Sequence, residues 1–414
     1  MKPVFKEEME YLKIPKHFED KLWVYARAYY VFDKDLNKVC IGKNIKKFPY
    51  VIDKYLTHLE MAELWYKNNT SNKVLYAKEQ LSQHLTSNVY SQKIINISGG
   101  KDSTVLHHMV EDMVNDYVGE TTTAFFNTSN ETHFTYGYIK RNYPHALTIN
   151  PKEGFYSFLD RKGTVPSRLI RLCCSTYKEG SATENFDVHK PIIHLVGIRK
   201  AESLKRSTYT REMKGSWNSL YAQQNWVMYC PMIDFEDEDI WAYLLYHKLP
   251  FNFLYRVGFG RIGCTHCSYR SVYEDELTSH FLSTYYIRWQ KFIEKLFIRE
   301  GMAVILNCTK KEFLDNGWRG GVYRKEATKE VIQDFADYRG LSYSEAEKYF
   351  KSSKCNCCGK KTLSKDMIAL NLKLLGRNTE ARYCMKCLAN YLETDVKTLE
   401  EQVKQFKDEG CNLF

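Results

Sequence analysis

The sequence has 414 residues, 44% of them hydrophobic and 27% charged, with a formal net charge of +10. This length suffices for one large α/β domain with one or two smaller units. No apolar run is long enough to cross a bilayer, and the charged first residues are not those of a signal peptide. We therefore expect a cytoplasmic protein with reduced cysteines and no membrane partner. The positive charge suits polyanions such as nucleic acid, although many proteins are mildly basic.

Residues 1–90 form an N-terminal extension without a chemical motif, with a strand-like stretch at 22–26 and helical patterns over 57–67 and 73–84. From 91 to 300, short apolar runs typical of buried strands alternate with helical patterns. The expected strands lie at 94–97, 122–126, 145–149 and 192–196, and the expected helices at 105–110, 132–143 and 236–247. This alternation predicts the α/β class, with a doubly wound parallel sheet covered on both faces.

The rest of the chain divides by composition into three parts. Residues 301–350 have helical patterns and form a connector, residues 351–392 are rich in cysteine and lysine, and residues 393–414 form a C-terminal helix and tail. No Pro/Gly/Ser-rich linker separates these parts, so we expect them to be packed together rather than strung out.

A polar, glycine-containing loop follows the first strand of the α/β domain. Its sequence is Ser98-Gly99-Gly100-Lys101-Asp102-Ser103, and a helix begins within it. The glycines let backbone N–H groups approach an anion closely, and the helix N-terminus supplies positive potential. The pattern is not Walker A, whose glycines are spaced differently. The loop therefore predicts a phosphate site.

This loop resembles the PP-loop, SGGKDS, of the ATP-pyrophosphatase superfamily. Three later segments resemble, in the same order, motifs of the superfamily branch related to phosphoadenosine phosphosulfate (PAPS) reductase. They are G-I-R-K-A-E-S-L-K-R at 197–206, C-P-M-I-D-F-E-D-E-D-I-W at 230–241 and Y-R-V-G-F-G-R-I-G-C-T-H-C at 255–267. The resemblance covers about residues 91–275 and implies an adenine nucleotide alpha-hydrolase-like fold that binds ATP with Mg²⁺.

The resemblance places the nucleotide at the carboxyl edge of the sheet. The residues that it implies for nucleotide binding are Ser98, Gly99, Gly100, Lys101, Asp102, Ser103, Gly197, Arg199, Glu202 and Ser203. It gives catalytic roles to Lys101, Asp102, Arg199 and Arg206. The three cations would offset charge on phosphate oxygens, and the carboxylate would help to place Mg²⁺.

Family reductases carry L-D-T-G after the second strand, a degraded phosphate loop and a catalytic E-C-G-x-H tail, and this chain departs from all three. The second strand is followed by Asn127-Thr128-Ser129, the loop is intact, and the last residues are Asp408-Glu409-Gly410-Cys411-Asn412-Leu413-Phe414. We interpret Cys411 as a thiol on a frayed tail, with a displaced redox cysteine as the alternative.

The first cysteine group comprises Cys173-Cys174 and Cys264-Thr265-His266-Cys267. Adjacent cysteines are a poor pattern for tetrahedral zinc but suit an iron–sulfur cubane, whose irons sit on separate corners. The set also resembles the [4Fe–4S] ligands of adenosine 5′-phosphosulfate (APS) reductases and of DNA phosphorothioation sulfur-insertion enzymes. We expect Cys173, Cys174, Cys264 and Cys267 to bind such a cluster; zinc and a metal-free structural role are the alternatives.

The second cysteine group consists of two C-x-x-C pairs, Cys355 with Cys358 and Cys384 with Cys387. Four thiolates from two such pairs predict a closed structural zinc site in a zinc-knuckle or treble-clef-like module over residues 351–392. Lysines and arginines crowd this segment. They suit either a nucleic-acid contact or a solvated module docked on the catalytic domain.

The favoured hypothesis is an enzyme that cleaves ATP to AMP and pyrophosphate, adenylates an oxygen of its substrate and lets a sulfur species displace AMP. Its partners would be a nucleic-acid substrate and a sulfur-donor protein. The second hypothesis is a PAPS or APS reductase that releases sulfite, with Cys411 as the attacking thiol. The third is a nucleic-acid-binding sensor of nucleotide or redox state, which would show no ATP turnover.

Overall fold

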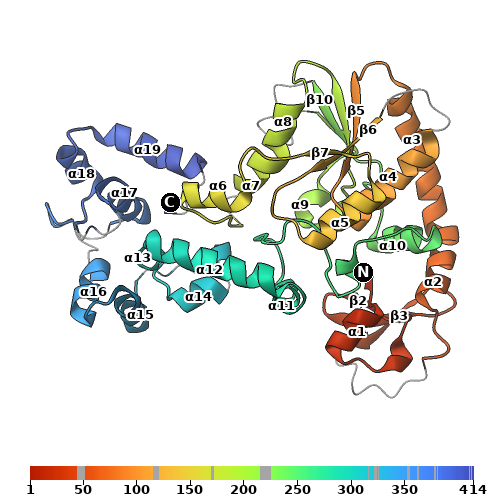
Figure 1. Ribbon diagram of the computed structural model, residues 1–414, viewed down its shortest axis with the longest axis horizontal. Helices are drawn as coiled ribbons and strands as arrows, with labels where there is room; N and C mark the ends of the chain where they lie inside the picture. The colour runs from red at the N-terminus through yellow and green to blue at the C-terminus, as the bar shows by residue number, and fades with distance from the viewer. Residues whose placement is uncertain are drawn as a thin grey trace. The chain divides into compact units, whose positions relative to one another are not determined.

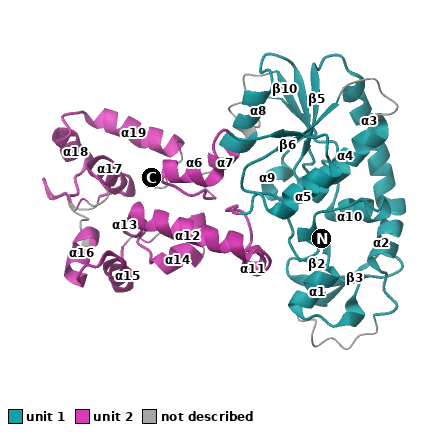
Figure 2. Cartoon of the chain, in the orientation of Figure 1, with its two compact units in different colours: residues 1–151, 176–265 teal, residues 152–175, 266–414 magenta. Residues whose placement is uncertain are grey.

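The computed structural model describes residues 1–43, 52–114, 121–168, 172–214, 225–315, 317–320, 324, 326–351, 355–360, 363–376, 379, 381–409, 411 and 413–414. The chain divides into two compact units. Residues 1–151 with 176–265 form unit 1, and residues 152–175 with 266–414 form unit 2 (Figure 2). The five parts expected from the sequence are divided differently, because residues 152–175 and 266–300 of the expected 91–300 domain belong to unit 2, and that division stays a prediction. No helix of the described residues combines the length and apolar character needed to cross a membrane.

The main sheet of unit 1 has the strand order β7-β6-β5-β8-β10-β9 (Figure 1). In that order, its strands are Leu147–Ile149, Thr121–Phe126, Gln92–Ile97, Ile192–Leu195, Trp226–Tyr229 and Glu212–Lys214. All neighbours are parallel except β9, which runs antiparallel to β10. The four strands expected from the sequence are confirmed to within a few residues, and β9 and β10 are additions.

Successive residues of β5 point to opposite faces of the sheet, as the pleat requires. Ile94 packs in one cluster with Ala182 of α8 (Ser181–Asn185). Ile95 packs in another cluster with Val105 and Leu106 of α4 (Lys101–Val114). Helices therefore cover both faces, and the doubly wound α/β arrangement is confirmed.

The strand order reverses between β5 and β8, because the chain adds β6 and β7 on one side of β5 and β8 and β10 on the other. The loops that follow these two strands, residues 98–100 and 196–199, therefore meet at the carboxyl edge of the sheet. Open α/β sheets bind their ligands at such a reversal. The other helices of this part are α5 (His133–Asn142), α9 (Leu204–Ser207) and α10 (Asp237–Tyr246).

The N-terminal extension forms an antiparallel sheet with the strand order β1-β2-β3-β4. These strands are Lys2–Pro3, Trp23–Tyr25, Ala28–Phe32 and Lys38–Gly42, and the helices are α1 (Lys6–Leu12), α2 (His58–Trp65) and α3 (Ser71–Thr86). Asp239 of α10 accepts hydrogen bonds from Trp65 Nε1 (3.1 Å), Thr70 Oγ1 (2.8 Å) and Lys73 Nζ (2.5 Å). The extension thus anchors the helix that begins at Asp237, a residue of the site described below.

The described residues of unit 2 are mainly helical, as expected for residues 301–350. The helices are α6 (Phe155–Lys162), α7 (Leu172–Cys174), α11 (Val272–Phe281), α12 (Ser283–Arg299), α13 (Met302–Leu306), α14 (Lys310–Asp315), α15 (Lys329–Arg339), α16 (Tyr343–Lys351), α17 (Lys365–Leu375), α18 (Met385–Tyr391) and α19 (Val396–Asp408). Leu370, Leu388 and Leu399 form the buried core between α17, α18 and α19.

Cys411 is buried rather than exposed on a frayed tail, so that interpretation is wrong. Its side chain is 6% exposed and packs in an apolar cluster with Ile305, Leu372 and Leu413. Its backbone N–H donates to the carbonyl oxygen of Phe406 at 2.8 Å. Burial of these apolar side chains fixes the last residues against α13 and α17.

Candidate functional site

The loop between β5 and α4 is held by its own hydroxyl groups. Ser98 N–H donates to Ser103 Oγ (3.2 Å), and the hydroxyls of Ser103 and Thr104 donate to Gly100 O at 2.9 and 3.1 Å. Gly99 has a φ of +74°, a conformation that favours glycine. The sharp turn places the N-terminus of the 14-residue helix α4 at the carboxyl edge of the sheet, where its positive potential attracts an anion.

Gly197, after β8, touches the start of the same helix. A Cβ added to Gly197 would lie 2.9 Å from the carbonyl carbon of Asp102 and 3.1 Å from Ser103 N. Both contacts are to backbone, which yields less easily than a side chain. The 197–206 segment therefore packs directly on the phosphate loop because residue 197 lacks a side chain.

Four charged side chains meet beside the loop. Arg199 Nε donates to Asp102 Oδ1 and Arg199 Nη2 donates to Asp237 Oδ1, both at 2.7 Å. Lys101 Nζ lies 2.9 Å from Asp102 Oδ2 and 3.5 Å from Asp237 Oδ1. The remaining nitrogen of Arg199 donates to Phe235 O at 3.1 Å, and the residue is only 1% exposed. Arg199 is thus committed to holding two carboxylates.

Both carboxylates of this network stay ionised at neutral pH. Burial opposes ionisation of Asp102, but the Lys101 ammonium and the Arg199 guanidinium outweigh it and hold its pKa below the ordinary value. Burial is likewise outweighed at Asp237, whose pKa is lowered by Lys101, by the Met1 α-amino group 2.8 Å away and by Arg199. Ionised carboxylate oxygens are ligands that suit Mg²⁺.

Glu202 organises the rest of the 197–206 segment. Its carboxylate accepts the backbone N–H of Arg199 at 2.9 Å and forms an ion pair with Arg206. Ser203 Oγ accepts the backbone N–H of Arg206 at 3.3 Å and so caps α9. The structure therefore brings Gly197 and Arg199 onto the phosphate loop, whereas Arg206 and Ser203 hydrogen-bond within residues 202–209. The nucleotide-binding and catalytic roles of these residues remain predictions.

Sequence reasoning missed two residues of this site, Asp237 and Tyr255. Tyr255 is 1% exposed, and its Oη accepts the backbone N–H of Lys101 at 2.9 Å. Burial raises the pKa of Tyr255 well above its ordinary value, so the phenol stays protonated. The one signal available was that both residues fall in segments that resemble family motifs, at 230–241 and 255–267.

The turn after β6 has the sequence Asn127-Thr128-Ser129 in place of the L-D-T-G of family reductases, and it is a tight turn. Asn127 Oδ1 accepts the N–H of Ser129 at 2.8 Å, and Ser129 adopts a φ of +52°. Thr128 Oγ1 donates to Glu131 Oε1 at 2.6 Å and lies 3.4 Å from Cys264 Sγ. Cys264 therefore lies beside this turn, after the carboxyl end of β6.

The first cysteine group is divided between the units. Cys264 belongs to unit 1, whereas Cys173, Cys174 and Cys267 belong to unit 2, and all four are half-buried. Among the described residues, none of them takes part in a close group of metal-ligand atoms. A cubane holds each thiolate on a separate corner and spaces its ligands more widely than a single ion does. This ligand set therefore stays a prediction.

Positive charge from two buried arginines and one exposed arginine surrounds His266, the residue before Cys267 in unit 2. Burial is the largest cause that lowers the pKa of His266 well below its ordinary value, followed by the charges of Arg270, Arg288 and Arg319. Arg319 Nε and His266 Nε2 are buried without a hydrogen-bond partner among the described residues. The Arg319 guanidinium is compensated by Asp275, to which its Nη2 donates at 2.6 Å, so this buried charge does not by itself call for an anionic ligand.

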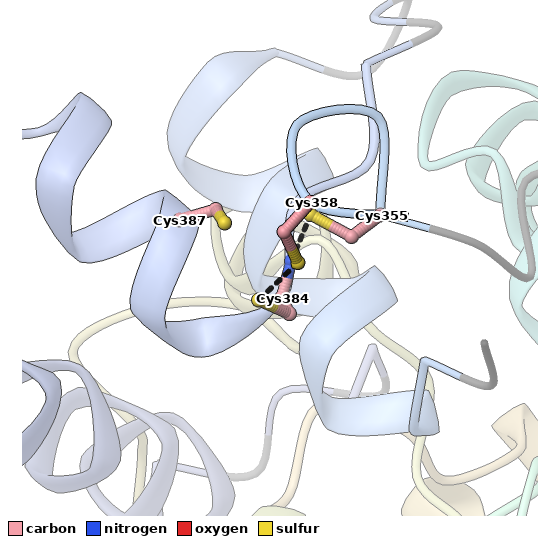
Figure 3. Close-up of side chains that lie close together, drawn as sticks. All are labelled: Cys355, Cys358, Cys384 and Cys387. Atoms are coloured by element: carbon pink, nitrogen blue, oxygen red, sulfur yellow. Dashed lines mark hydrogen bonds between the residues drawn. The ribbon is translucent and has the colours of Figure 1, made fainter. Parts of the chain in front are cut away.

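The second cysteine group comes together in space (Figure 3). The sulfur atoms of Cys355, Cys358, Cys384 and Cys387 all lie within 4.8 Å of one another, and Cys358 Sγ is 3.7 Å from Cys384 Sγ. Tetrahedral bonds of about 2.3 Å to one ion would separate two sulfur atoms by about 3.8 Å. Burial opposes ionisation of Cys355, but backbone hydrogen bonds from Cys358 and Cys384 outweigh it and lower its pKa to about 6. This group can hold a metal ion.

Comparison with known proteins finds similarity over the residues that carry this site. The family model for the phosphoadenosine phosphosulfate reductase domain matches residues 92–270. An adenosine 5′-phosphosulfate reductase of Neisseria meningitidis is 31% identical over 144 residues, which are 31% of this chain and 53% of that protein. An uncharacterized protein of Methanocaldococcus jannaschii is 27% identical over 175 residues, 42% of this chain and 40% of that protein.

A crystal structure of PAPS reductase from Candida auris is 16% identical and covers 49% of this chain and 93% of that one, with a TM-score of 0.35. The chain spans about half the length of the curated relatives it matches. The phosphate loop and its charge network lie inside the matched residues. Residues 92–270 are therefore similar to a PAPS reductase domain, which is consistent with the PAPS reductase-like branch of the PP-loop superfamily.

Proposed function

We propose that this domain cleaves ATP to AMP and pyrophosphate and thereby activates an acceptor for sulfur transfer. An oxygen of the acceptor attacks the α-phosphorus, and the bond to the bridging oxygen breaks as pyrophosphate leaves. A sulfur nucleophile then attacks the acceptor carbon, and AMP departs with the acceptor oxygen. The intact loop of residues 98–103 carries the proposal, because its full set of glycines, hydroxyls and lysine suits a pyrophosphate group.

Each group of the site has a task in this reaction. The N–H groups and hydroxyls of residues 98–103 hold the pyrophosphate, and Lys101 offsets the charge that develops on its oxygens. Arg199 aligns Asp102 and Asp237, whose carboxylates receive the Mg²⁺ that accompanies ATP. Arg206, ion-paired with Glu202, adds positive charge near the same segment.

The cysteine groups would serve the second half of the reaction. When bound to Cys173, Cys174, Cys264 and Cys267, a [4Fe–4S] cluster would relay the sulfur that is transferred. The four-cysteine group of residues 355–387 would hold a structural zinc ion, whose binding energy stabilises the small module around it. Nucleic acid is the proposed acceptor, because the net charge is +10 and basic residues crowd the same module.

The test is release of pyrophosphate by anaerobically purified protein given Mg-ATP and either tRNA or duplex DNA as the acceptor. We expect release that depends on the acceptor, and at least about tenfold weaker ATP binding by a Lys101→Ala, Ser103→Ala double variant, since charge-assisted hydrogen bonds are lost. Lys140→Ala, at an exposed position of α5, is the matched control. Unchanged nucleotide affinity in the double variant would contradict the phosphate-loop assignment. Tight nucleic-acid binding without ATP turnover would favour a sensor instead.

The same preparation tests both metal groups. Brown protein with about four irons and one zinc per chain is the expected result, because each cysteine of a cubane holds one iron. Substitution of Cys264 by serine should remove the colour and leave the zinc in place. Colourless, iron-free protein with zinc at both groups would refute the cluster.

A second candidate is an APS or PAPS reductase, which the name of the Neisseria meningitidis relative favours. Such an enzyme would release sulfite from APS or PAPS without ATP and would need an accessible attacking thiol. Cys411, the thiol considered for this role, is buried in the apolar cluster of unit 2. Sulfite release that disappears in Cys411→Ser would make the reductase the better assignment.

A further inference from the structure

Unit 2 contains a cavity of about 300 Å³ whose lining includes Arg382 of the four-cysteine module but no residue of the first cysteine group or of the phosphate loop. Its lining includes two arginines, two aromatic rings and aliphatic side chains, namely Arg339, Arg382, Phe335, Tyr349, Val304 and Leu372. The described lining holds no acidic residue. The volume is at the lower end of the range of about 300–1,000 Å³ for small-molecule sites.

Arg382 is fixed at the buried side of this cavity. It is 0% exposed, and its Nη1 donates to the carbonyl oxygens of Thr379 (2.7 Å) and Ala381 (2.9 Å). Its backbone N–H donates to Asn356 Oδ1 at 2.7 Å, and the N–H of Asn356 donates back to Arg382 O at 2.7 Å. Because Asn356 follows Cys355, the fold of the four-cysteine module positions a permanently charged guanidinium at the cavity.

Arg339 supplies the second guanidinium, from the last residue of α15. Its Nη2 donates to Ile298 O at 2.9 Å, and its guanidinium lies 5.7 Å from the ring centroid of Phe335. Arg339 and Tyr349 are half-buried, whereas Phe335 and Arg382 are buried. The cavity therefore combines a half-buried cation, which lies beside the Phe335 ring, with a fully buried one.

We propose that this cavity binds a phosphate monoester that carries an aromatic ring, of the size of a nucleoside monophosphate. The planar guanidinium of Arg339 matches the geometry of a phosphate and binds it with charge-assisted hydrogen bonds, and the buried guanidinium of Arg382 adds positive potential. The rings of Phe335 and Tyr349 offer a stacking surface for a base, and the aliphatic side chains exclude water around it. A free mononucleotide and the 5′-phosphorylated end of a nucleic acid share this chemistry.

Equilibrium dialysis with AMP counts the sites. We expect two AMP per wild-type chain, one at the phosphate loop and one in the cavity. The Lys101→Ala, Ser103→Ala double variant should retain the cavity site alone. In that background, Arg339→Met should weaken the remaining binding at least about tenfold, since a charge-assisted contact is lost. Val304→Phe, which fills the cavity and leaves both arginines in place, should weaken it as well.

Arg161→Met, at an exposed arginine of unit 2 that is paired with Glu153, is the matched control and should leave AMP binding unchanged. Zinc content and circular dichroism check the fold of each variant, and Arg339→Lys replaces Arg339→Met if the latter unfolds. AMP binding that Arg339→Met and Val304→Phe leave intact would overturn the cavity site. Two AMP sites in the Lys101→Ala, Ser103→Ala variant would instead overturn the loop assignment.

DNA oligonucleotides with a 5′-phosphate or a 5′-hydroxyl identify the source of the ligand. Tighter binding of the phosphorylated form, abolished by Arg339→Met, would assign the cavity to nucleic-acid ends. Equal binding of the two forms, together with AMP binding, would assign it to free mononucleotides. If Arg339→Met changes the affinity for neither AMP nor either oligonucleotide, the proposal is refuted in both forms.

Discussion

Replacement of Gly197 by alanine tests whether the 197–206 segment positions the phosphate loop. The added Cβ would lie 2.9 Å from the carbonyl carbon of Asp102, whereas ordinary contacts begin at 3.4 Å, so one backbone must move by about 0.5 Å. Overpacking of this kind costs about 1–3 kcal/mol. Since α4 begins at Lys101, we expect the loop donors to shift with the helix.

A displacement of about 1 Å can lower the activity of a site about a hundredfold. A shift of half that size should therefore weaken ATP binding about tenfold. Isothermal titration calorimetry with Mg-ATP measures the affinity, and thermal unfolding reports the packing cost. Gly137→Ala in α5 is the control, because its Cβ would meet only the flexible guanidinium of Arg141 at 3.5 Å. Wild-type affinity and melting temperature in Gly197→Ala would refute the close-packing argument.

Four further predictions follow from the same structure. Removal of Mg²⁺ with EDTA should weaken ATP binding at least about tenfold, measured by calorimetry, since Asp102 and Asp237 are ionised. Cys358→Ser or Cys384→Ser should release about one zinc per chain and lower the melting temperature, and full zinc retention in metal analysis would exclude the assigned ligands. Burial lowers the pKa of His58 and of His194 to about 4. Below about pH 6.5 the unfolded chain therefore binds more protons than the folded chain, and the free energy of unfolding decreases as the pH is lowered. Each histidine should lower the free energy of unfolding by about 2 kcal/mol between pH 7 and pH 5. In urea unfolding, His58→Gln should reduce this pH-dependent loss by the same amount. Cys411→Ser should destabilise the protein by about 1–3 kcal/mol in urea unfolding, because it buries a hydroxyl in an apolar cluster, while pyrophosphate release stays unchanged.

The features that could be predicted from the sequence have local signals. The β-branched run at 94–97 indicates a buried strand, and the glycines and hydroxyls that follow indicate a turn into a helix; the structure places β5, the loop and α4 there. The thiols of Cys355, Cys358, Cys384 and Cys387 are likewise specified by their C-x-x-C spacing, and the structure gathers their sulfur atoms within 4.8 Å.

The features that could not be predicted depend on contacts between distant residues. Asp237 is one of several acids at the start of α10, where the helix dipole alone accounts for a carboxylate. Its second role appears only when Arg199, 38 residues earlier, reaches it. The partner of Tyr255 lies 154 residues away, and Cys411 is buried by helices whose packing no local pattern specifies.

The charge network also explains why the proposed reaction needs its metal ion. The side chains of Lys101 and Arg199 carry two positive charges, and those of Asp102 and Asp237 carry two negative ones, so the four groups are electrically balanced by themselves. A triphosphate that approached alone would meet two carboxylates as well as two cations. Mg²⁺ offsets the phosphate charge and takes carboxylate oxygens as ligands, which leaves the Lys101 ammonium available for the phosphates. In the proposed reaction Arg199, buried on both carboxylates, would keep their oxygens aligned for the ion rather than touch the nucleotide.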